Sequence, residues 1–134
     1  MKALDDRVLV AGQIRPGDMA AIAAAGVTLV VNNRPDGEEP GQPPAADIEA
    51  AARAAGLDYR FIPIAGGLQA EAVEATAQAL EAADGKSLLF CGSGTRSTYL
   101  WALARARRGA DAGPLLSAAA AAGYDLRPLL PRLR

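Results

Sequence analysis

Short runs of apolar, often β-branched residues alternate along the chain with longer alanine-rich stretches. The short runs predict strands at residues 7–10, 27–31, 59–64 and 87–90. The longer stretches predict helices at residues 16–25, 44–55, 69–83, 96–108 and 114–122. This alternation favours an α/β fold, in which helices cover a mainly parallel sheet.

The length of the chain fits a single domain spanning residues 1–134, large enough to bury roughly two-thirds of the surface of the unfolded chain. Hydrophobic residues make up 51% of the sequence, largely as alanine, and aromatic residues only 4%. This composition suits closely packed helices on a sheet better than a sandwich of aromatic-rich strands.

The net charge of −1 gives no electrostatic basis for binding nucleic acid or an anionic membrane surface. No apolar stretch approaches the roughly 18 residues that span a bilayer, and the first residues lack the apolar core of a signal peptide. A single cysteine cannot form an internal disulfide, which agrees with a reducing compartment. We therefore expect a cytoplasmic protein with no nucleic-acid or membrane partner, and the oligomeric state is left open.

Histidine is absent from the sequence, and this excludes several kinds of chemistry. No imidazole can activate a nucleophile as in Ser-His-Asp or Cys-His hydrolases. Histidine-based zinc sites are excluded as well, and one cysteine cannot form a thiolate cluster. We expect no metal and no cofactor, so any chemistry at the cysteine depends on its own pKa and on carboxylates.

The only cysteine, Cys91, follows the predicted strand at 87–90 and precedes a short glycine-containing loop that enters a helix at Arg96. Backbone N–H groups of such a loop, together with a helix N-terminus, form an anion site. A thiol there is biased toward thiolate, with a pKa brought from about 8.5 into a range of roughly 3.5–7.5. The guanidinium of Arg96 can clamp a bound oxyanion. The residues expected to contact that anion are Gly92, Ser93, Gly94, Thr95 and Ser97.

Each of these residues also has an ordinary structural interpretation. Cys91 could be a small buried hydrophobic residue, and Arg96 a surface residue of its helix. Thr95 and Ser97 could cap the helix or donate a hydrogen bond to the sulfur, and the sequence leaves both options open. Binding of a nucleotide is disfavoured, because the loop departs from the dinucleotide pattern and no Walker lysine is present.

A long loop at residues 32–44 is rich in proline and in charge. It leaves the carboxyl end of a predicted parallel strand, at the sheet edge from which the Cys91 loop also emerges, and ligand sites in open α/β sheets form there. This loop could carry Arg34, Asp36 and Glu38 over the thiol, with Arg34 binding substrate and Asp36 donating a proton to the leaving group. The alternative is a solvated surface turn.

Several segments of the chain, in their order along it, resemble the phosphatase-like domain family of the beta-lactamase-hydrolase-like proteins. This family is a bacterial branch of the protein tyrosine phosphatase fold. The resemblance implies a three-layer α/β fold with a mainly parallel sheet of four to five strands flanked by helices. It also implies an anion loop centred on Cys91, in a family whose members are described as phosphatases or as sulfurtransferases. The matching segments are 30–38 with 42–43, 59–64, 91–97 continuing into 100–103, and 122–125.

The sequence departs from tyrosine phosphatases at several positions. Four residues, not five, separate Cys91 from Arg96, a spacing closer to that of rhodaneses. Phe90 stands where these enzymes usually have histidine, and Gly92 where this family commonly has a basic residue. Residues 65–67 are Ala-Gly-Gly where dual-specificity phosphatases keep an aspartate, so an acid would have to come from Asp36 or Glu38.

The sequence therefore predicts a Cys-dependent phosphatase that acts on a small anionic substrate through a phosphocysteine. A sulfurtransferase that carries a persulfide on Cys91 is the second hypothesis. A third is a module that binds an oxyanion without turnover.

Overall fold

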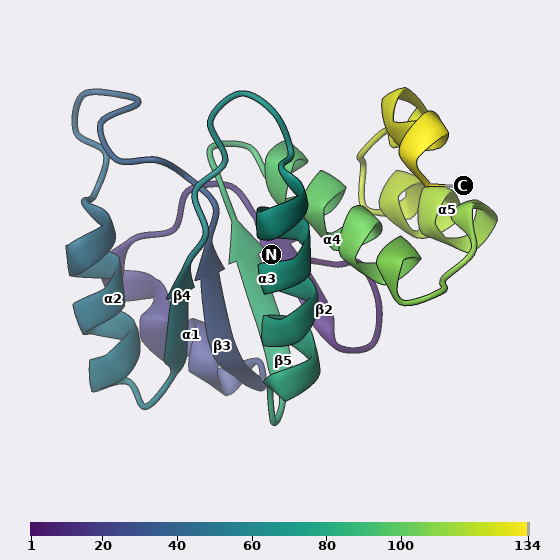
Figure 1. The fold of residues 1–134 in the computed structure, drawn as a ribbon. Coiled ribbons are helices and arrows are strands. Elements are labelled where there is room, and N and C mark those ends of the chain that lie inside the picture. The colour runs from purple at the N-terminus through teal and green to yellow at the C-terminus, as the bar shows by residue number, and fades with distance from the viewer. Residues whose placement is uncertain (134) are drawn as a thin grey trace.

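A five-stranded sheet forms the centre of the structure, a computed structural model that describes residues 1–133 (Figure 1). The strand order is β1-β2-β5-β3-β4. Strand β1 runs antiparallel to β2, whereas the other neighbours are parallel. The strands are β1 (Lys2–Ala3), β2 (Val8–Ala11), β3 (Val27–Asn32), β4 (Asp58–Phe61) and β5 (Lys86–Phe90).

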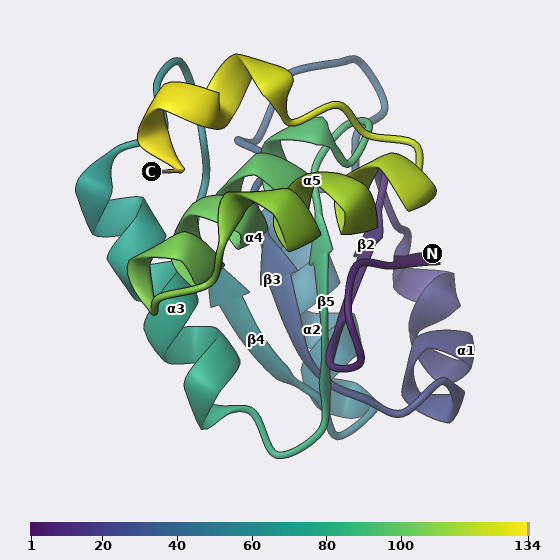
Figure 2. The ribbon, with the colours of Figure 1, turned by 90° about the vertical axis from the view of Figure 1, so that its right-hand side faces the viewer.

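Helices cover both faces of this sheet, as the α/β pattern of the sequence predicts. Helices α1 and α2 lie on one face and α3 and α4 on the other, while α5 and the C-terminal 3-10 helix lie over α4 (Figure 2). The helices are α1 (Met19–Ala24), α2 (Ala45–Ala54), α3 (Ala70–Ala82), α4 (Thr95–Arg107) and α5 (Ala112–Ala121). Short 3-10 helices occupy Pro16–Asp18 and Arg127–Arg132.

Strand β5 is apolar on both faces because helices cover both of them. Leu88 and Phe90 pack with the α1 and α2 side, and Leu89 packs with the α3 and α4 side. All three side chains are fully buried, and burial of each leucine stabilises the fold by about 2 kcal/mol. This explains why the run before Cys91 is continuous rather than alternating.

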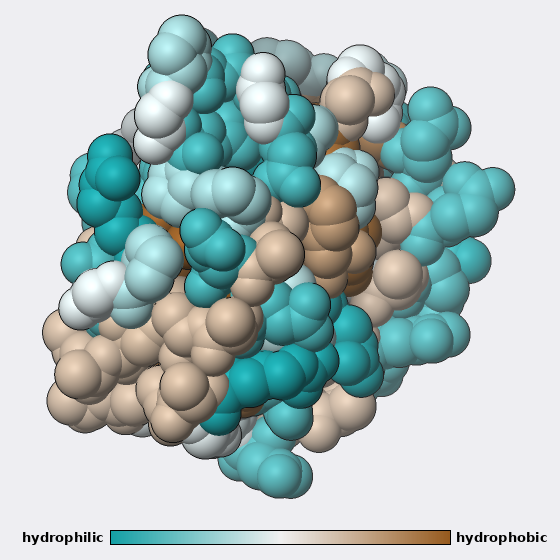
Figure 3. All heavy atoms as spheres, turned by 90° about the vertical axis from the view of Figure 1, so that its left-hand side faces the viewer, coloured by the Kyte–Doolittle hydropathy of each residue, from teal (hydrophilic) through white to brown (hydrophobic). Residues whose placement is uncertain are grey.

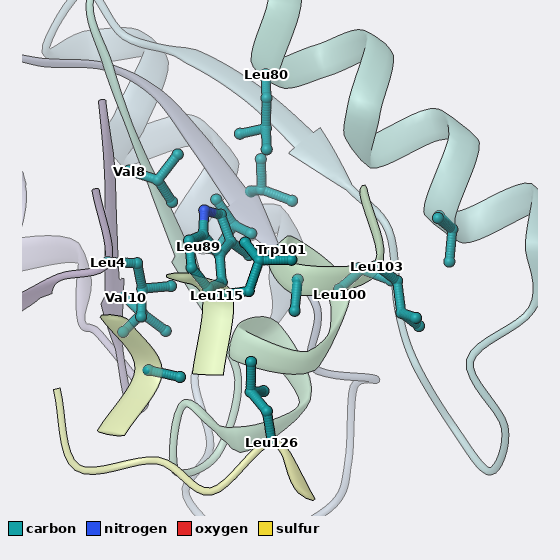
Figure 4. Packing of buried hydrophobic residues seen from close by; sticks show 14 of the residues in the cluster. Leu4, Val8, Val10, Leu80, Leu89, Leu100, Trp101, Leu103, Leu115 and Leu126 are labelled. Carbon is teal, nitrogen blue, oxygen red and sulfur yellow. The ribbon is translucent and has the colours of Figure 1, made fainter. Parts of the chain in front are cut away.

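Trp101 is in the middle of the larger core, on the α4 side of the sheet (Figure 4). Its ring packs among the aliphatic residues of that cluster. Its indole N–H donates to Asp5 Oδ2 at 2.9 Å, and Arg105 also donates to this oxygen. The buried indole is therefore satisfied by the turn between β1 and β2.

The surface on the α2 side mixes hydrophilic with weakly hydrophobic residues (Figure 3). Alanines of α2 such as Ala46, Ala50 and Ala54 are exposed there. Of the helices described within residues 1–133, none is both long and apolar enough to cross a membrane.

One predicted strand differs in extent from the observed one, and β1 was not predicted. The predicted strand 59–64 is observed as Asp58–Phe61, and beyond it only the N–H groups of Ile62 and Ile64 still donate to the carbonyls of Asn32 and Asn33. The two-residue β1 gives too short a pattern to be found in a sequence.

Every parallel strand ends at the same edge, so the loops after β2, β3, β4 and β5 meet there (Figure 1).

Candidate active site

The Cys91 loop joins the middle strand β5 to the N-terminus of α4, as the sequence predicts. Cys91 is fully buried, and the backbone N–H of Gly94 donates to its Sγ at 3.1 Å. The loop thus folds back over the sulfur, with an amide directed at it.

Hydrogen bonds offset the cost of placing a thiolate in this buried position. Burial alone raises the pKa of Cys91. The backbone N–H and hydroxyl of Ser97, with the N–H groups of Ser93 and Gly94, outweigh burial and hold the pKa below its ordinary value. The sulfur is therefore biased toward the form that acts as a nucleophile.

Arg96 lies beside the sulfur and is held by one edge of its guanidinium. Its Nη1 donates to Glu38 Oε2 at 2.8 Å and to the carbonyl of Ile64 at 2.9 Å, and its Nη2 donates to Glu38 Oε1 at 2.8 Å. The guanidinium has five N–H donors, so Nε–H and the second Nη2–H are not used by Glu38 or Ile64 and are available to the sulfur of Cys91. After Glu38, the charge and hydrogen bond of this sulfur help to raise the pKa of Arg96. A side chain at Gly92 would begin 3.5 Å from Nη2, so these donors lie next to the Cys91 loop.

Glu38 is the carboxylate that the loop at 32–44 places on Arg96. It also accepts from Arg34 Nε at 3.0 Å. The hydrogen bonds from Arg96 hold the pKa of Glu38 at about 2; burial opposes them, and the weaker effect of the hydrogen bond from Arg34 adds to the lowering. Glu38 is therefore ionised at neutral pH and anchors Arg96 rather than donating a proton.

Arg34 is buried beside the anion loop. Its Nη1 donates to Gln13 Oε1 at 3.0 Å, and its Nε lies 3.6 Å from where a side chain at Gly92 would begin. The structure therefore brings Arg34 to the site, where it adds a second positive charge close to the loop.

Asp36 lies at the start of α2, where its Oδ1 accepts from the backbone N–H of Ala45 at 2.7 Å. It satisfies one of the donors that a helix N-terminus leaves unpaired. The sequence reasoning placed Asp36 over the thiol as an acid, but the contact observed is with this helix. The proton-donor role of Asp36 stays a prediction.

The hydroxyl residues of the loop have different partners. Ser93 Oγ accepts from the backbone N–H of Thr95 at 3.3 Å and donates to Thr95 Oγ1 at 3.0 Å, so Ser93 supports the first turn of α4. Ser97 is fully buried, and its hydroxyl donates to Asn33 Oδ1 at 2.8 Å. Ser97 is thus the hydroxyl residue that links the sulfur to the sheet.

Three residues of this site were given no role in the sequence analysis: Gln13, Asn33 and Tyr124. Asn33 could have been noticed as a polar residue that directly follows an apolar strand, whereas Gln13 carries no such signal. Tyr124 donates from its hydroxyl to the Ser93 carbonyl at 3.0 Å. Burial and then the nearby charge of Cys91 raise the pKa of this phenol. Tyr124 therefore closes the outer side of the loop.

Within residues 1–133, no group of three or more His, Cys, Asp or Glu side chains could hold a metal ion. What the arrangement offers chemically is a sulfur biased toward thiolate, amides directed toward it, and a guanidinium with free donors beside it.

The family model described as "Beta-lactamase hydrolase-like protein, phosphatase-like domain" matches residues 1–108. A beta-lactamase hydrolase-like protein of Agrobacterium fabrum is 41% identical over 112 residues, which cover 81% of this chain and 26% of the relative. The chain thus spans about a quarter of the length of this curated relative.

Solved structures share the fold. A candidate phosphatase of Neisseria meningitidis superposes with a TM-score of 0.85 at 32% identity, over 98% of this chain and 94% of the other. Human DUSP28 gives a TM-score of 0.70 at 20% identity, over 97% and 90% of the two chains. TpbA of P. aeruginosa in complex with pTyr gives 0.62 at 18% identity, over 85% and 67%.

The fold is that of the protein tyrosine phosphatase-like proteins, with a central sheet flanked by helices. With a match over most of its length and 41% identity to a curated relative, the chain belongs to the phosphatase-like domain family of the beta-lactamase hydrolase-like proteins.

Proposed function

We propose that the chain is a phosphatase in which Cys91 forms a phosphocysteine with a small anionic phosphate ester. The membership of a phosphatase-like family and the tyrosine phosphatase-like fold support a phosphatase-like function. The observation that carries the finer proposal is the pairing of two features at Cys91. Its sulfur accepts from the Gly94 N–H at 3.1 Å, and Arg96 keeps donors free beside it.

In the first step the Cys91 thiolate attacks phosphorus, so that a P–S bond forms and the P–O bond to the leaving group breaks. The electron pair of that bond goes to the leaving oxygen, which needs a proton unless the group is a stable anion. Loop amides and the Nε edge of Arg96 bind the equatorial oxygens as their charge grows. Because Cys91 is fully buried, substrate binding requires a small outward movement at the mouth of the loop.

In the second step water attacks phosphorus, the P–S bond breaks and its electron pair returns to sulfur as a thiolate. A base must take one proton from the water. We propose Asp36 as donor in the first step and acceptor in the second, which requires its carboxylate to leave the N-terminus of α2. Glu38 is a poor candidate, because a pKa of about 2 leaves it without a proton to give.

A sulfurtransferase is the second candidate function, and the spacing of four residues between Cys91 and Arg96 favours it. Here the thiolate attacks the outer sulfur of a donor such as thiosulfate. An S–S bond forms on Cys91, the donor bond breaks, and sulfite leaves with the electron pair. This reaction needs no proton donor, so the position of Asp36 would be irrelevant to it.

The test compares p-nitrophenyl phosphate hydrolysis with sulfur transfer from thiosulfate to cyanide. We expect Cys91→Ser to abolish phosphate release and Arg96→Ala to lower it by about 10² to 10³-fold, the loss typical of one oxyanion donor. Arg107→Ala is the matched control, because this exposed arginine of the same helix binds Glu74 and should leave the rate unchanged.

Turnover of the phosphate ester that survives Cys91→Ser would overturn the covalent mechanism. Sulfur transfer without phosphate release would establish the second candidate. If both activities are absent while inorganic phosphate protects Cys91 from alkylation, the site is an oxyanion-binding module without turnover.

A further inference from the structure

Asn33 is a fully buried asparagine immediately after β3. Its backbone N–H donates to the carbonyl of Phe90 at 2.8 Å, and its backbone carbonyl accepts from the N–H of Ile64 at 2.9 Å. Phe90 directly precedes Cys91 in the chain. The position of Asn33 is therefore fixed by the strand that carries the nucleophile.

The orientation of the Asn33 amide follows from its partners. Its Nδ2 donates to the carbonyl of Ile62 at 2.9 Å, and a carbonyl can only accept. Oδ1 is consequently the atom that faces Ser97, at 2.8 Å from Ser97 Oγ. Since Oδ1 has no proton, the hydroxyl of Ser97 is the donor in this bond.

The Ser97 hydroxyl has one proton and two acceptors within reach. One is Asn33 Oδ1, to which it donates at 2.8 Å in the structure; the other is the sulfur of Cys91, whose pKa this hydroxyl helps to lower. A hydroxyl cannot donate fully to both, because its single proton lies on one line at a time. The backbone N–H of Ser97 also lowers the pKa of Cys91, but a backbone N–H cannot rotate to another acceptor as a hydroxyl can.

We propose that Asn33 is a positioning residue, which gives the proton of Ser97 an alternative acceptor and so limits how far that hydroxyl donates to Cys91. The inference rests on the proposed use of Cys91 as a thiolate. The Ser97 hydroxyl donates to Asn33 while the sulfur of Cys91 is uncharged, either as a thiol or in the phosphocysteine. It donates to the sulfur when the P–S bond breaks and Cys91 becomes a thiolate. A thiolate held too tightly would be a weaker nucleophile, and Asn33 prevents this.

Other charged and titratable groups near the sulfur come from three further segments. They are Arg96 of α4, Tyr124 after α5, and Arg34 with Glu38 of the loop at 32–44. None of them binds the Asn33 side chain in the structure described for residues 1–133. Substitution of Asn33 therefore leaves their charges in place.

The test is the pH dependence of alkylation of Cys91 by iodoacetamide, which needs no turnover. Without Asn33 Oδ1 the Ser97 proton goes to sulfur alone, so Asn33→Ala should lower the pH midpoint by about one unit, the size of one hydrogen bond to a charged group. Ser97→Ala should raise the midpoint. The double variant should match Ser97→Ala, because no hydroxyl remains to be directed.

Two further variants separate positioning from simple loss of structure. Asn33→Leu keeps the branching at Cγ and the number of heavy atoms but has no acceptor, and should reproduce the shift if Asn33→Ala does not fold. Tyr59→Phe is the control, because it removes another buried hydrogen bond beside β3, that to Asn32, and should leave the midpoint unchanged. An unchanged or raised midpoint in both Asn33 variants would overturn the proposal, as would a shift that persists without Ser97. If the midpoints move as expected but no phosphate is released, the positioning role holds and the phosphatase proposal fails.

Discussion

Gly94 determines the shape of the anion loop more directly than any of its neighbours. Its φ of 94° lies in the left-handed region that favours glycine. A Cβ at this position would overlap with the Tyr124 hydroxyl oxygen. An alanine here would therefore meet two separate obstacles, one from the backbone and one from the phenol.

We expect Gly94→Ala to destabilise the protein and to remove activity, because the loop must move away from Tyr124. Gly109→Ala is the matched control. Its φ is 97° but no atom lies within 4 Å of the added Cβ, so it costs only about 1 kcal/mol of backbone strain. Urea unfolding of both variants measures the difference. Equal losses of free energy of unfolding would show that the phenol contact has no effect.

Single residues of the site differ in how far the sequence could predict them. Cys91 and Arg96 were found because one loop carries both, so their proximity is a local property of the chain. Which carboxylate meets Arg96 depends instead on how the loop at 32–44 folds. Gln42 accepts from the N–H of Glu38 and donates to the carbonyl of Pro35. These bonds hold Glu38 next to Arg96. They could not be deduced from the spacing of residues in the sequence.

At the scale of elements, the N-terminus of α2 depends on a residue nine positions before it. Asp36 caps that end through the N–H of Ala45, and its negative charge is favourable at the positive end of a helix. The same residue is our proposed acid. The two roles can be separated, because asparagine keeps an acceptor oxygen but cannot donate an acidic proton.

We expect Asp36→Ala to lower the free energy of unfolding by about 1 kcal/mol, the usual cost of losing a cap, and Asp36→Asn to lower it by less. If Asp36 is also the acid, Asp36→Asn should slow substrates with poor leaving groups by about 10²-fold or more, and activated esters little. Chemical denaturation and a series of aryl phosphates measure the two effects. If Asp36→Asn reduces the rate by the same factor for every substrate in the series, Asp36 only caps α2.

The alternation of strands and helices was predictable from the sequence, because each element buries a face of its own against one sheet. The predicted end of one strand at Ile64 was wrong, because β4 ends at Phe61, although the N–H groups of Ile62 and Ile64 still donate to the carbonyls of Asn32 and Asn33. Tyr124 reaches the loop from the segment after α5, 31 residues beyond Ser93. Contacts of this kind depend on the packing of α5 over α4 and leave no local pattern.

For the whole molecule, four carboxylates with lowered pKa values should make stability fall in acid: Glu38, Glu74, Asp5 and Asp125, the last of which is hydrogen-bonded to Arg127. Hydrogen bonds from Arg96 hold the pKa of Glu38 at about 2, and those from Arg108 and Arg107 do the same for Glu74. The pKa of Asp5 is also lowered: burial opposes this, but hydrogen bonds from Trp101 and other donors outweigh it. The unfolded chain therefore binds more protons than the folded protein below pH 4.5.

We expect the melting temperature to be steady above about pH 5 and to drop progressively toward pH 2 as these groups take up protons. Glu74→Gln should reduce the slope, because one titrating group is removed. Salt should weaken the contribution of the exposed Glu74 pair. Thermal unfolding monitored by circular dichroism at several pH values checks this, and a melting temperature that is flat down to pH 2.5 would contradict it.

The central position of β5 has a consequence for how long the thiol survives. This strand has a hydrogen-bonded neighbour on each side and a helical layer on each face, so it opens only when much of the sheet opens with it. Cys91 follows directly and shares that protection. Oxidants, like substrate, therefore reach the sulfur only through the small movement at the mouth of the loop and not through fraying of the strand, while the amides that bind an anion stay in register between encounters.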